Sequence, residues 1–405
     1  MTLSVYSEVS KLKKVLLHRP GTELEQLTPN HLGRMLFDDI PYLHGAQKEH
    51  DAFADTLRSE GAEVLYIEDL AAETIKQDPS LRRQFIQDFI RESGALGLYY
   101  QKELERLLRD IEDEKELVLK TMSGVTDRES QLNGRHPLVK ARGQELRFIL
   151  DPIPNLYFTR DPFSVIGKGV AISSMKAGAR RRETIYGRYV LRYHPDYAGK
   201  VPMYYDPESP FSIEGGDILC LGNGLLMIGI SERTTPEAIE LLAERLFEDE
   251  DSGFTAILAA DIPNMRAYMH LDTVFTQVDH TVFTVHPGIL STLRLWRLEK
   301  KDGIVRAEEQ RGTPEDVLAR NMQVDKVTLI RCGGSDMIAA EREQWNDGSN
   351  TLCVAPGRVV VYDRNSVTNA ILRDHGLTTI EVPGAELGRG RGGPRCMSMP
   401  FVRGE

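Results

Sequence analysis

The chain has 405 residues, a formal net charge of −11 at pH 7, and the hydrophobic and charged fractions of an ordinary globular protein, which argues against a disordered or fibrous chain. No stretch of about eighteen apolar residues is present to span a membrane, and the acidic balance disfavours nucleic acid, whose binding depends on phosphate neutralisation by Lys and Arg. The N-terminal residues lack a secretory signal and the four cysteines contain no CxxC pair, so we expect a cytoplasmic protein with reduced thiols.

The first elements predicted along the chain are a strand, a helix and a second strand. Residues 14–18 form an apolar run that ends at Pro20-Gly21, which predicts a buried strand. Residues 44–60 repeat apolar side chains at helical spacing, and residues 62–67 predict another strand.

The pattern changes between residues 71 and 147, where apolar residues follow helical spacing and the other positions are filled by charged residues and Gln. The clearest run is Leu104, Leu107, Leu108 and Ile111. We therefore predict that residues 71–147 form an inserted helical bundle. Residues 1–70 and 148–405 would together form the catalytic α/β part.

A hairpin, a helix and a closing strand recur in the second half of the chain. Residues 217–230 predict a hairpin around Gly222-Asn223-Gly224, followed by a helix at 236–248 and a strand at 255–258. The same order recurs at residues 352–382. Such repetition is typical of a radially repeated α/β fold.

Four segments place polar residues beside predicted strands, where functional sites are expected to break structural patterns. The first carries Asn155 and Asp161, and its alternative interpretation is a turn in which Asp161 bonds its own backbone. The second places Glu214 and Asp217 on either side of a glycine pair, which lets a backbone approach a ligand closely. Its alternative is a glycine bulge with two solvated acids.

The third segment contains His270 and Asp272, which would lie on the same face of a strand. This pair could provide acid–base groups or, with a carboxylate of the second segment, metal ligands; a core histidine is the alternative without function. The fourth segment, residues 388–396, places three arginines near Cys396 in a glycine-rich loop. These charges would favour the thiolate, whereas a structural cysteine would have apolar cover.

Taken together, the four segments resemble the arginine deiminases, a family of the guanidine-modifying enzyme superfamily. The resemblance runs from Leu36-Phe37-Asp38-Asp39 to Pro400 and includes residues 341–348 and 362–365. It implies a fivefold pseudosymmetric α/β propeller of ββαβ-type units with an inserted helical domain. The predicted insertion favours an enzyme for free arginine over a dimethylarginine hydrolase or a peptidylarginine deiminase.

The resemblance also implies roles for the polar residues. Cys396 matches the nucleophile that attacks the central carbon of the guanidinium. Asp161 and Asp272 match the carboxylates that hold this planar cation by charge-assisted hydrogen bonds. His270 and Glu214 match the acid–base pair, in which the histidine moves protons to ammonia and from water.

Other matching positions bind the amino-acid end of the substrate or close the site. Three of them would hold the α-carboxylate: Asn155, Arg180 and Arg233. Asp217 would lie at the edge of the site, in contact with substrate or just behind it. Leu36 and Arg391 match loop residues that close over the substrate, and Asp39 matches a partner that holds this arginine.

We therefore expect an enzyme without cofactor or metal that hydrolyses free L-arginine to L-citrulline and ammonia through a thiouronium-type intermediate on Cys396, in arginine catabolism. Besides the substrate, the expected partner is a further copy of the chain in a dimer or larger homo-oligomer. We expect no binding to nucleic acid or to a membrane. The nearest alternative is another enzyme of the superfamily, such as an amidinotransferase or a dimethylarginine hydrolase. An alternative of another class is a non-catalytic protein that binds arginine or single-stranded nucleic acid.

Overall fold

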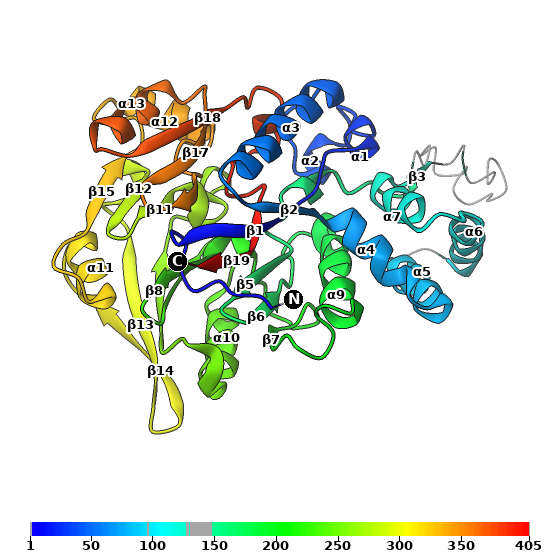
Figure 1. Cartoon of the computed structure of the whole chain (residues 1–405), viewed down its shortest axis with the longest axis horizontal. Coiled ribbons are helices and arrows are strands. Elements are labelled where there is room, and N and C mark those ends of the chain that lie inside the picture. The colour runs from blue at the N-terminus through cyan, green and yellow to red at the C-terminus, as the bar shows by residue number, and fades with distance from the viewer. Residues whose placement is uncertain (1, 95–96, 127–128, 130–147, 405) are drawn as a thin grey trace.

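The computed structural model describes residues 2–94, 97–126, 129 and 148–404, and it has an α/β fold with mixed sheets (Figure 1). In this part of the chain, five units share one topology, in which an antiparallel strand pair is followed by a third strand parallel to the second. The units are β5 (Phe163–Ile166), β6 (Gly169–Ile172) and β7 (Met203–Tyr205); β8 (Ile218–Gly222), β9 (Leu225–Ile230) and β10 (Ala256–Asp261); β11 (Phe275–Asp279), β12 (Val282–Val285) and β15 (Thr328–Arg331); β16 (Leu352–Ala355), β17 (Arg358–Tyr362) and β18 (Thr378–Val382); and β19 (Met399–Gly404), β1 (Lys11–Leu17) and β2 (Glu63–Tyr66).

A helix lies between the second and third strand of every unit in the described chain: α3 (Leu43–Ser59), α9 (Thr184–Tyr193), α10 (Pro236–Glu248), α11 (Pro314–Met322) and α13 (Ser366–Asp374). Two of these helices start with the same Thr-Pro-Glu sequence. The hydroxyls of Thr235 and Thr313 accept the hydrogen bonds that cap α10 and α11. A proline follows each threonine at the first helical position, where a backbone N–H would have no partner within the helix. The predicted order of hairpin, helix and closing strand is confirmed at both stretches where the sequence showed it.

The two ends of the chain form one unit together. The C-terminal β19 pairs antiparallel with β1, from Lys11 opposite Gly404 to Leu16 opposite Met399, and β1 pairs in parallel with β2. Figure 1 accordingly shows the two termini close to each other. Because β19 begins three residues after Cys396, its pairing with β1 fixes the loop that carries this cysteine against the N-terminal strand.

The helical segment predicted as an insertion lies at one side of the α/β part (Figure 1). Its helices in the described chain are α4 (Ile67–Lys76), α5 (Pro79–Glu92), α6 (Leu98–Arg109) and α7 (Glu114–Ser123). Helix α4 crosses the predicted boundary at residue 70, and the boundary at residue 147 lies outside the described residues. Helix α5 packs on α9, where the Phe85 ring lies 5.2 Å from that of Tyr189 and 6.2 Å from that of Tyr186.

A hairpin that the sequence did not predict extends the second unit. It consists of β13 (Arg294–Lys301) and β14 (Ile304–Gln310), which continue the sheet in the order β14-β13-β10-β9-β8 and project from the molecule in Figure 1. The remaining short elements are α1 (Thr22–Glu25), α2 (Leu32–Met35), α12 (Met337–Trp345), β3 (Val125–Thr126) and β4 (Phe148–Leu150). None of the described helices combines the length and apolar character needed to cross a membrane.

The packing of α5 on α9 predicts that the helical segment contributes to the stability of the whole chain. Replacing the fully buried Phe85 by Ala should lower the free energy of unfolding by about 3–5 kcal/mol, because it removes an aromatic side chain from a closed core. Denaturant-induced unfolding measures this change. Leu98→Ala on α6, where the side chain is exposed, is the control and should change the free energy by less than about 0.5 kcal/mol. Equal stability of Phe85→Ala and wild type would contradict this packing.

Candidate active site

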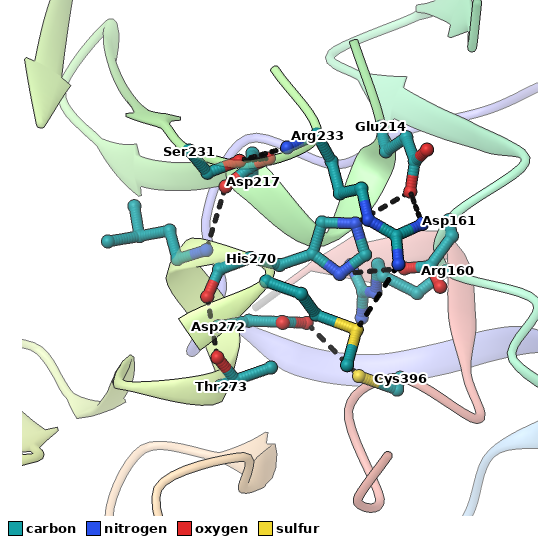
Figure 2. Close-up of polar contacts among 12 residues, drawn as sticks. Arg160, Asp161, Glu214, Asp217, Ser231, Arg233, His270, Asp272, Thr273 and Cys396 are labelled. Carbon is teal, nitrogen blue, oxygen red and sulfur yellow. Dashed lines mark hydrogen bonds and ion pairs between the residues drawn. The ribbon is translucent and has the colours of Figure 1, made fainter. Parts of the chain in front are cut away.

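Five of the predicted site residues lie together in the structure, on segments that lead into the first strands of four units (Figure 2). Asp161 precedes β5, Glu214 precedes β8, His270 and Asp272 precede β11, and Cys396 precedes β19. Each of the five has at most 3% of its surface exposed. The fold therefore brings together, at the starts of strands, side chains that are far apart in the sequence.

His270 is held between two carboxylates. Its Nε2 lies 2.8 Å from Oε2 of Glu214, and its Nδ1 lies 3.8 Å from Oδ1 of Asp161. Burial alone would lower the pKa of this imidazole, but the charges of Asp161 and Glu214 outweigh burial and raise it to about 9. Burial likewise opposes ionisation of Glu214, yet the hydrogen bond from His270 and the nearby Arg233 lower its pKa to about 2. At neutral pH the pair is therefore an imidazolium and a carboxylate.

His270 and Asp272 do not lie on a strand, which was the condition for their side chains to share one face. His270 precedes a 3₁₀ turn, Leu271–Thr273, which contains Asp272. The Thr273 hydroxyl donates to the His270 carbonyl at 2.7 Å, and the Leu271 N–H donates to Asp217 at 2.7 Å, so local hydrogen bonds form a turn in place of a strand. Within the described residues, no group of three or more His, Cys, Asp or Glu side chains is arranged to hold a metal ion.

The glycine pair between Glu214 and Asp217 permits the close approach of these segments. A Cβ on Gly216 would lie 2.8 Å from Cγ of His270 and 2.9 Å from Oδ1 of Asp161, so only glycine fits beneath the imidazole. The alternative of a bulge with two solvated acids is wrong, because Glu214 and Asp217 are fully buried.

The Cys396 thiol lies next to Asp272, with Sγ 3.5 Å from Oδ2. Burial raises the pKa of this thiol well above its ordinary value, and the charges of Asp272 and Asp161 raise it further, while Arg395 opposes them. In the free protein, the arginines of this loop therefore do not outweigh burial and the neighbouring carboxylates. Arg389 instead contacts Asp39, and the Arg391 guanidinium lies over the Trp345 ring.

Asp161 and Asp272 each have one buried oxygen, Oδ1, with no hydrogen-bond partner among the described residues. Their other oxygens are paired, since Arg180 Nη1 lies 2.8 Å from Oδ2 of Asp161 and Arg395 Nη1 lies 2.8 Å from Oδ2 of Asp272. A buried carboxylate oxygen without a partner is costly unless a donor reaches it. The site can therefore accept hydrogen bonds from a cation placed between these carboxylates and Cys396.

Arg395 is a buried residue of the site that the sequence did not indicate. Besides Asp272, it contacts both carboxylate oxygens of Glu8 at 3.1 Å and the carbonyl of Ile218 at 2.8 Å. Burial would raise the pKa of Glu8, but Arg395 and Arg160 lower it to about 2. A segment near the N-terminus thus fixes the arginine that orients Asp272.

The residues predicted to bind the α-carboxylate are all buried, and two of them, Arg180 and Arg233, contact carboxylates of this group. Arg180 also contacts Glu183, with its Nη2 2.7 Å from Oε2, so its position is fixed from two sides. Arg233 Nη1 lies 3.7 Å from Oε2 of Glu214, and its Nε and Nη1 have no hydrogen-bond partner among the described residues. Asn155 donates to the carbonyl of Met35 at 2.8 Å, which connects it to the segment that contains Leu36.

Asp217 is fully buried, and Leu36 and Arg391 each follow a short helical segment. Asp217 accepts hydrogen bonds from Ser231, Thr234 and the Leu271 N–H, so it lies behind His270 and braces the turn. Leu36 and Arg391 both have left-handed backbone angles, with φ of 62° and 65°. The predicted pairing of Asp39 with Arg391 is not found: Asp39 contacts Arg389, and Asp38 lies 3.7 Å from Arg391 Nη1.

Known sequences match nearly the whole chain. The family model described as arginine deiminase matches residues 33–403. The arginine deiminase of Treponema denticola is 52% identical over 403 residues, with 99% of this chain and 98% of that protein covered. The arginine deiminase of Streptococcus agalactiae serotype V is 52% identical over 406 residues, with the same coverage of both proteins.

Solved structures of lower sequence identity share the fold. An amidinotransferase of Microseira wollei from the saxitoxin biosynthetic pathway has a TM-score of 0.57 at 15% identity, covering 100% of this chain and 98% of its own. A dimethylarginine dimethylaminohydrolase bound to S-methyl-L-thiocitrulline has a TM-score of 0.54 at 18% identity, covering 96% of this chain and 100% of its own.

The geometry around His270 predicts an imidazolium that persists above neutral pH. Histidine NMR should show that His270 loses its proton near pH 9 in the wild type, and that Glu214→Gln lowers its pKa by about one unit or more, since an opposite charge in contact is removed. His18, which contacts Glu23 and Glu68, is an internal control and should not move. Titration of wild-type His270 near its ordinary value of about 6.5 would contradict this account.

Proposed function

The chain belongs to the arginine deiminase family, and from this premise we propose that it hydrolyses free L-arginine to L-citrulline and ammonia through a covalent intermediate on Cys396. The observation that carries the proposal is that Asp161 and Asp272 each keep a buried carboxylate oxygen without a hydrogen-bond partner among the described residues, and that Asp272 contacts the thiol. A guanidinium is a planar cation with several N–H donors, so it supplies hydrogen bonds and charge to both oxygens at once.

Substrate binding prepares the nucleophile. In the free protein, burial and the negative charges of Asp272 and Asp161 raise the pKa of Cys396 and so favour the thiol. A guanidinium between these carboxylates offsets that repulsion, so the thiol loses its proton to solvent as the substrate binds. The thiolate then attacks the central carbon, which the two carboxylates hold in position.

His270 and Glu214 move the protons of both steps. The imidazolium donates a proton to the departing nitrogen, ammonia leaves, and a thiouronium remains on Cys396. The neutral imidazole then takes a proton from water, which adds to the same carbon. Collapse of this second adduct breaks the carbon–sulfur bond and restores the thiolate, and loss of the hydroxyl proton to solvent yields citrulline. Glu214 keeps the ring oriented by its 2.8 Å contact throughout.

The amino-acid end of the substrate would be bound by Asn155, Arg180 and Arg233. The Nε and Nη1 of Arg233 have no hydrogen-bond partner among the described residues, which supports this role because both can donate to a carboxylate. Arg180 keeps a second N–H on each terminal nitrogen after its contacts with Asp161 and Glu183. Asp217 would act from behind His270.

The loop residues and the larger architecture belong to the same proposal. Leu36 and Arg391 would close over the bound substrate. Asp38, in place of Asp39, would be the carboxylate beside Arg391. The five units would surround one pseudo-fivefold axis as a propeller with Cys396 near its centre, and residues 71–147 would be an inserted helical domain. We also propose that the protein acts in the cytoplasm as a homo-oligomer in arginine catabolism.

Loss of the nucleophile tests this reaction. Wild-type protein should release citrulline and ammonia in equal amounts from L-arginine, and Cys396→Ala should reduce turnover by on the order of 10⁴-fold or more. Cys353→Ala is the matched control, because this buried cysteine contacts the backbone carbonyls of Val278 and Ala355, and it should keep activity. A folded wild type that makes no citrulline would contradict the proposal.

Recognition of the α-carboxylate can be tested separately with agmatine, which is arginine without that group. Arg233→Gln should lower kcat/KM for arginine by about 10- to 100-fold, because it removes a charge-assisted contact, and should leave the low value for agmatine nearly unchanged. Arg294→Gln on the exposed hairpin is the control. An equal loss for both substrates would argue that Arg233 acts on Glu214 rather than on the carboxylate.

A further inference from the structure

A fully buried amide contacts the nucleophile directly. Asn350 lies between α12 and β16, and its Nδ2 is 3.1 Å from the Cys396 sulfur. The same nitrogen donates to the Asp272 carbonyl at 3.0 Å, and Oδ1 accepts the Cys396 N–H at 3.0 Å. The amide thus joins the nucleophile to the neighbouring carboxylate segment.

The contacts of Asn350 fix which way its amide points. A backbone N–H can only donate, so the atom facing the Cys396 N–H is the oxygen, and the nitrogen faces the sulfur. One N–H of Asn350 meets the Asp272 carbonyl, which can only accept, and the other is left for the sulfur. The sulfur must therefore accept this hydrogen bond, as a thiolate does far better than a thiol.

We propose that Asn350 is a further catalytic residue, the hydrogen-bond donor that stabilises the Cys396 thiolate as it attacks and again as it leaves. This inference rests on the proposed function. In the free protein the thiol can donate to Asp272 while it accepts from Asn350. When the thiol ionises, its contact with Asp272 becomes repulsive, whereas the bond from Asn350 becomes charge-assisted and stronger.

The surroundings hold Asn350 rigidly on both sides. The carbonyl of Ser349 accepts hydrogen bonds from Thr276 at 2.7 Å and from Thr284 at 3.2 Å. The hydroxyl of Thr276 also lies 2.8 Å from that of Thr351. On the other side, a Cβ on Gly393 would lie 2.9 Å from Oδ1 of Asn350, so a glycine is needed there. The donor is therefore preorganised before the thiolate forms.

The topology gives an independent reason for this assignment. Four units of the described chain contribute a site residue on the segment leading into their first strand, as Asp161, Glu214, Asp272 and Cys396 do. Asn350 stands two residues before β16, the first strand of the remaining unit. Each of the five units thus supplies a side chain to the same group from an equivalent place in its topology.

Titration of the thiol in Asn350 variants tests the proposal. Asn350→Ala removes the amide, and Asn350→Leu keeps its approximate size while removing the donor without adding a charge. The probe is the pH dependence of alkylation by iodoacetamide, with a Cys396→Ala blank for the other cysteines. Both variants should raise the thiol pKa by about one unit or more, since hydrogen bonds to charged groups are among the strong ones.

Turnover of L-arginine supplies the second readout. The kcat of both variants should fall about 10- to 100-fold, with KM for arginine within about threefold, because the amide acts on sulfur. Asn321→Ala, a buried amide on α11 that contacts Arg297 and Val317, is the control and should match wild type in both assays. If Asn350→Ala does not fold, Asn350→Leu decides.

A thiol pKa equal to that of wild type in the folded variants would overturn the proposal. Alkylation does not require arginine hydrolysis, so this result is distinct from a failure of the proposed function. A wild type without citrulline production would overturn the function, while the titration would still report the contact between Asn350 and Cys396.

Discussion

The burial of three carboxylates around one thiol and one imidazole is the constraint on which this site depends. Such charges are costly without partners, and the fold supplies a cation for each: Arg180 with Asp161, Arg233 and His270 with Glu214, and Arg395 with Asp272. These pairs leave one oxygen of Asp161 and one of Asp272 without a hydrogen bond. The negative charge of the carboxylates is therefore not fully paired where a guanidinium would lie. Together with burial, this excess negative charge raises the pKa of the Cys396 thiol.

The fold meets this constraint by repetition. In each unit, a polar segment leads into the first strand and brings one side chain to the site. The pairing of β19 with β1 completes the last unit. The sequence predicted this recurrence wherever a hairpin, a helix and a strand were regularly spaced. It did not reveal that the first strand of the chain belongs to the last unit, because that pairing joins residues almost 400 positions apart, such as Leu12 and Arg403.

The site was predictable where a residue type contradicted its surroundings, as with Asp161, Glu214 and Cys396 beside apolar strands. Glu8, Arg395 and Asn350 carried no comparable signal. An amide in a turn and an acid near the N-terminus are ordinary by themselves, and Glu8 meets Arg395 across 387 positions of sequence. Asn350 could have been found only by asking which residue precedes the first strand of the fourth hairpin. His270 lies before a turn and not on a strand, because local hydrogen bonds from Thr273 and to Asp217 favour the turn.

The most direct test of the account is the identity of the adduct on Cys396 during turnover. Wild-type protein mixed with L-arginine would be quenched in acid, digested and analysed by mass spectrometry. The account predicts that Cys396 carries the whole of arginine less one ammonia, because the carbon–nitrogen bond to the chain stays intact. An adduct of the amidino group alone, with ornithine released, would show transfer chemistry instead. Absence of any adduct on Cys396 at steady-state turnover, or its presence on another cysteine, would contradict the nucleophile assigned here.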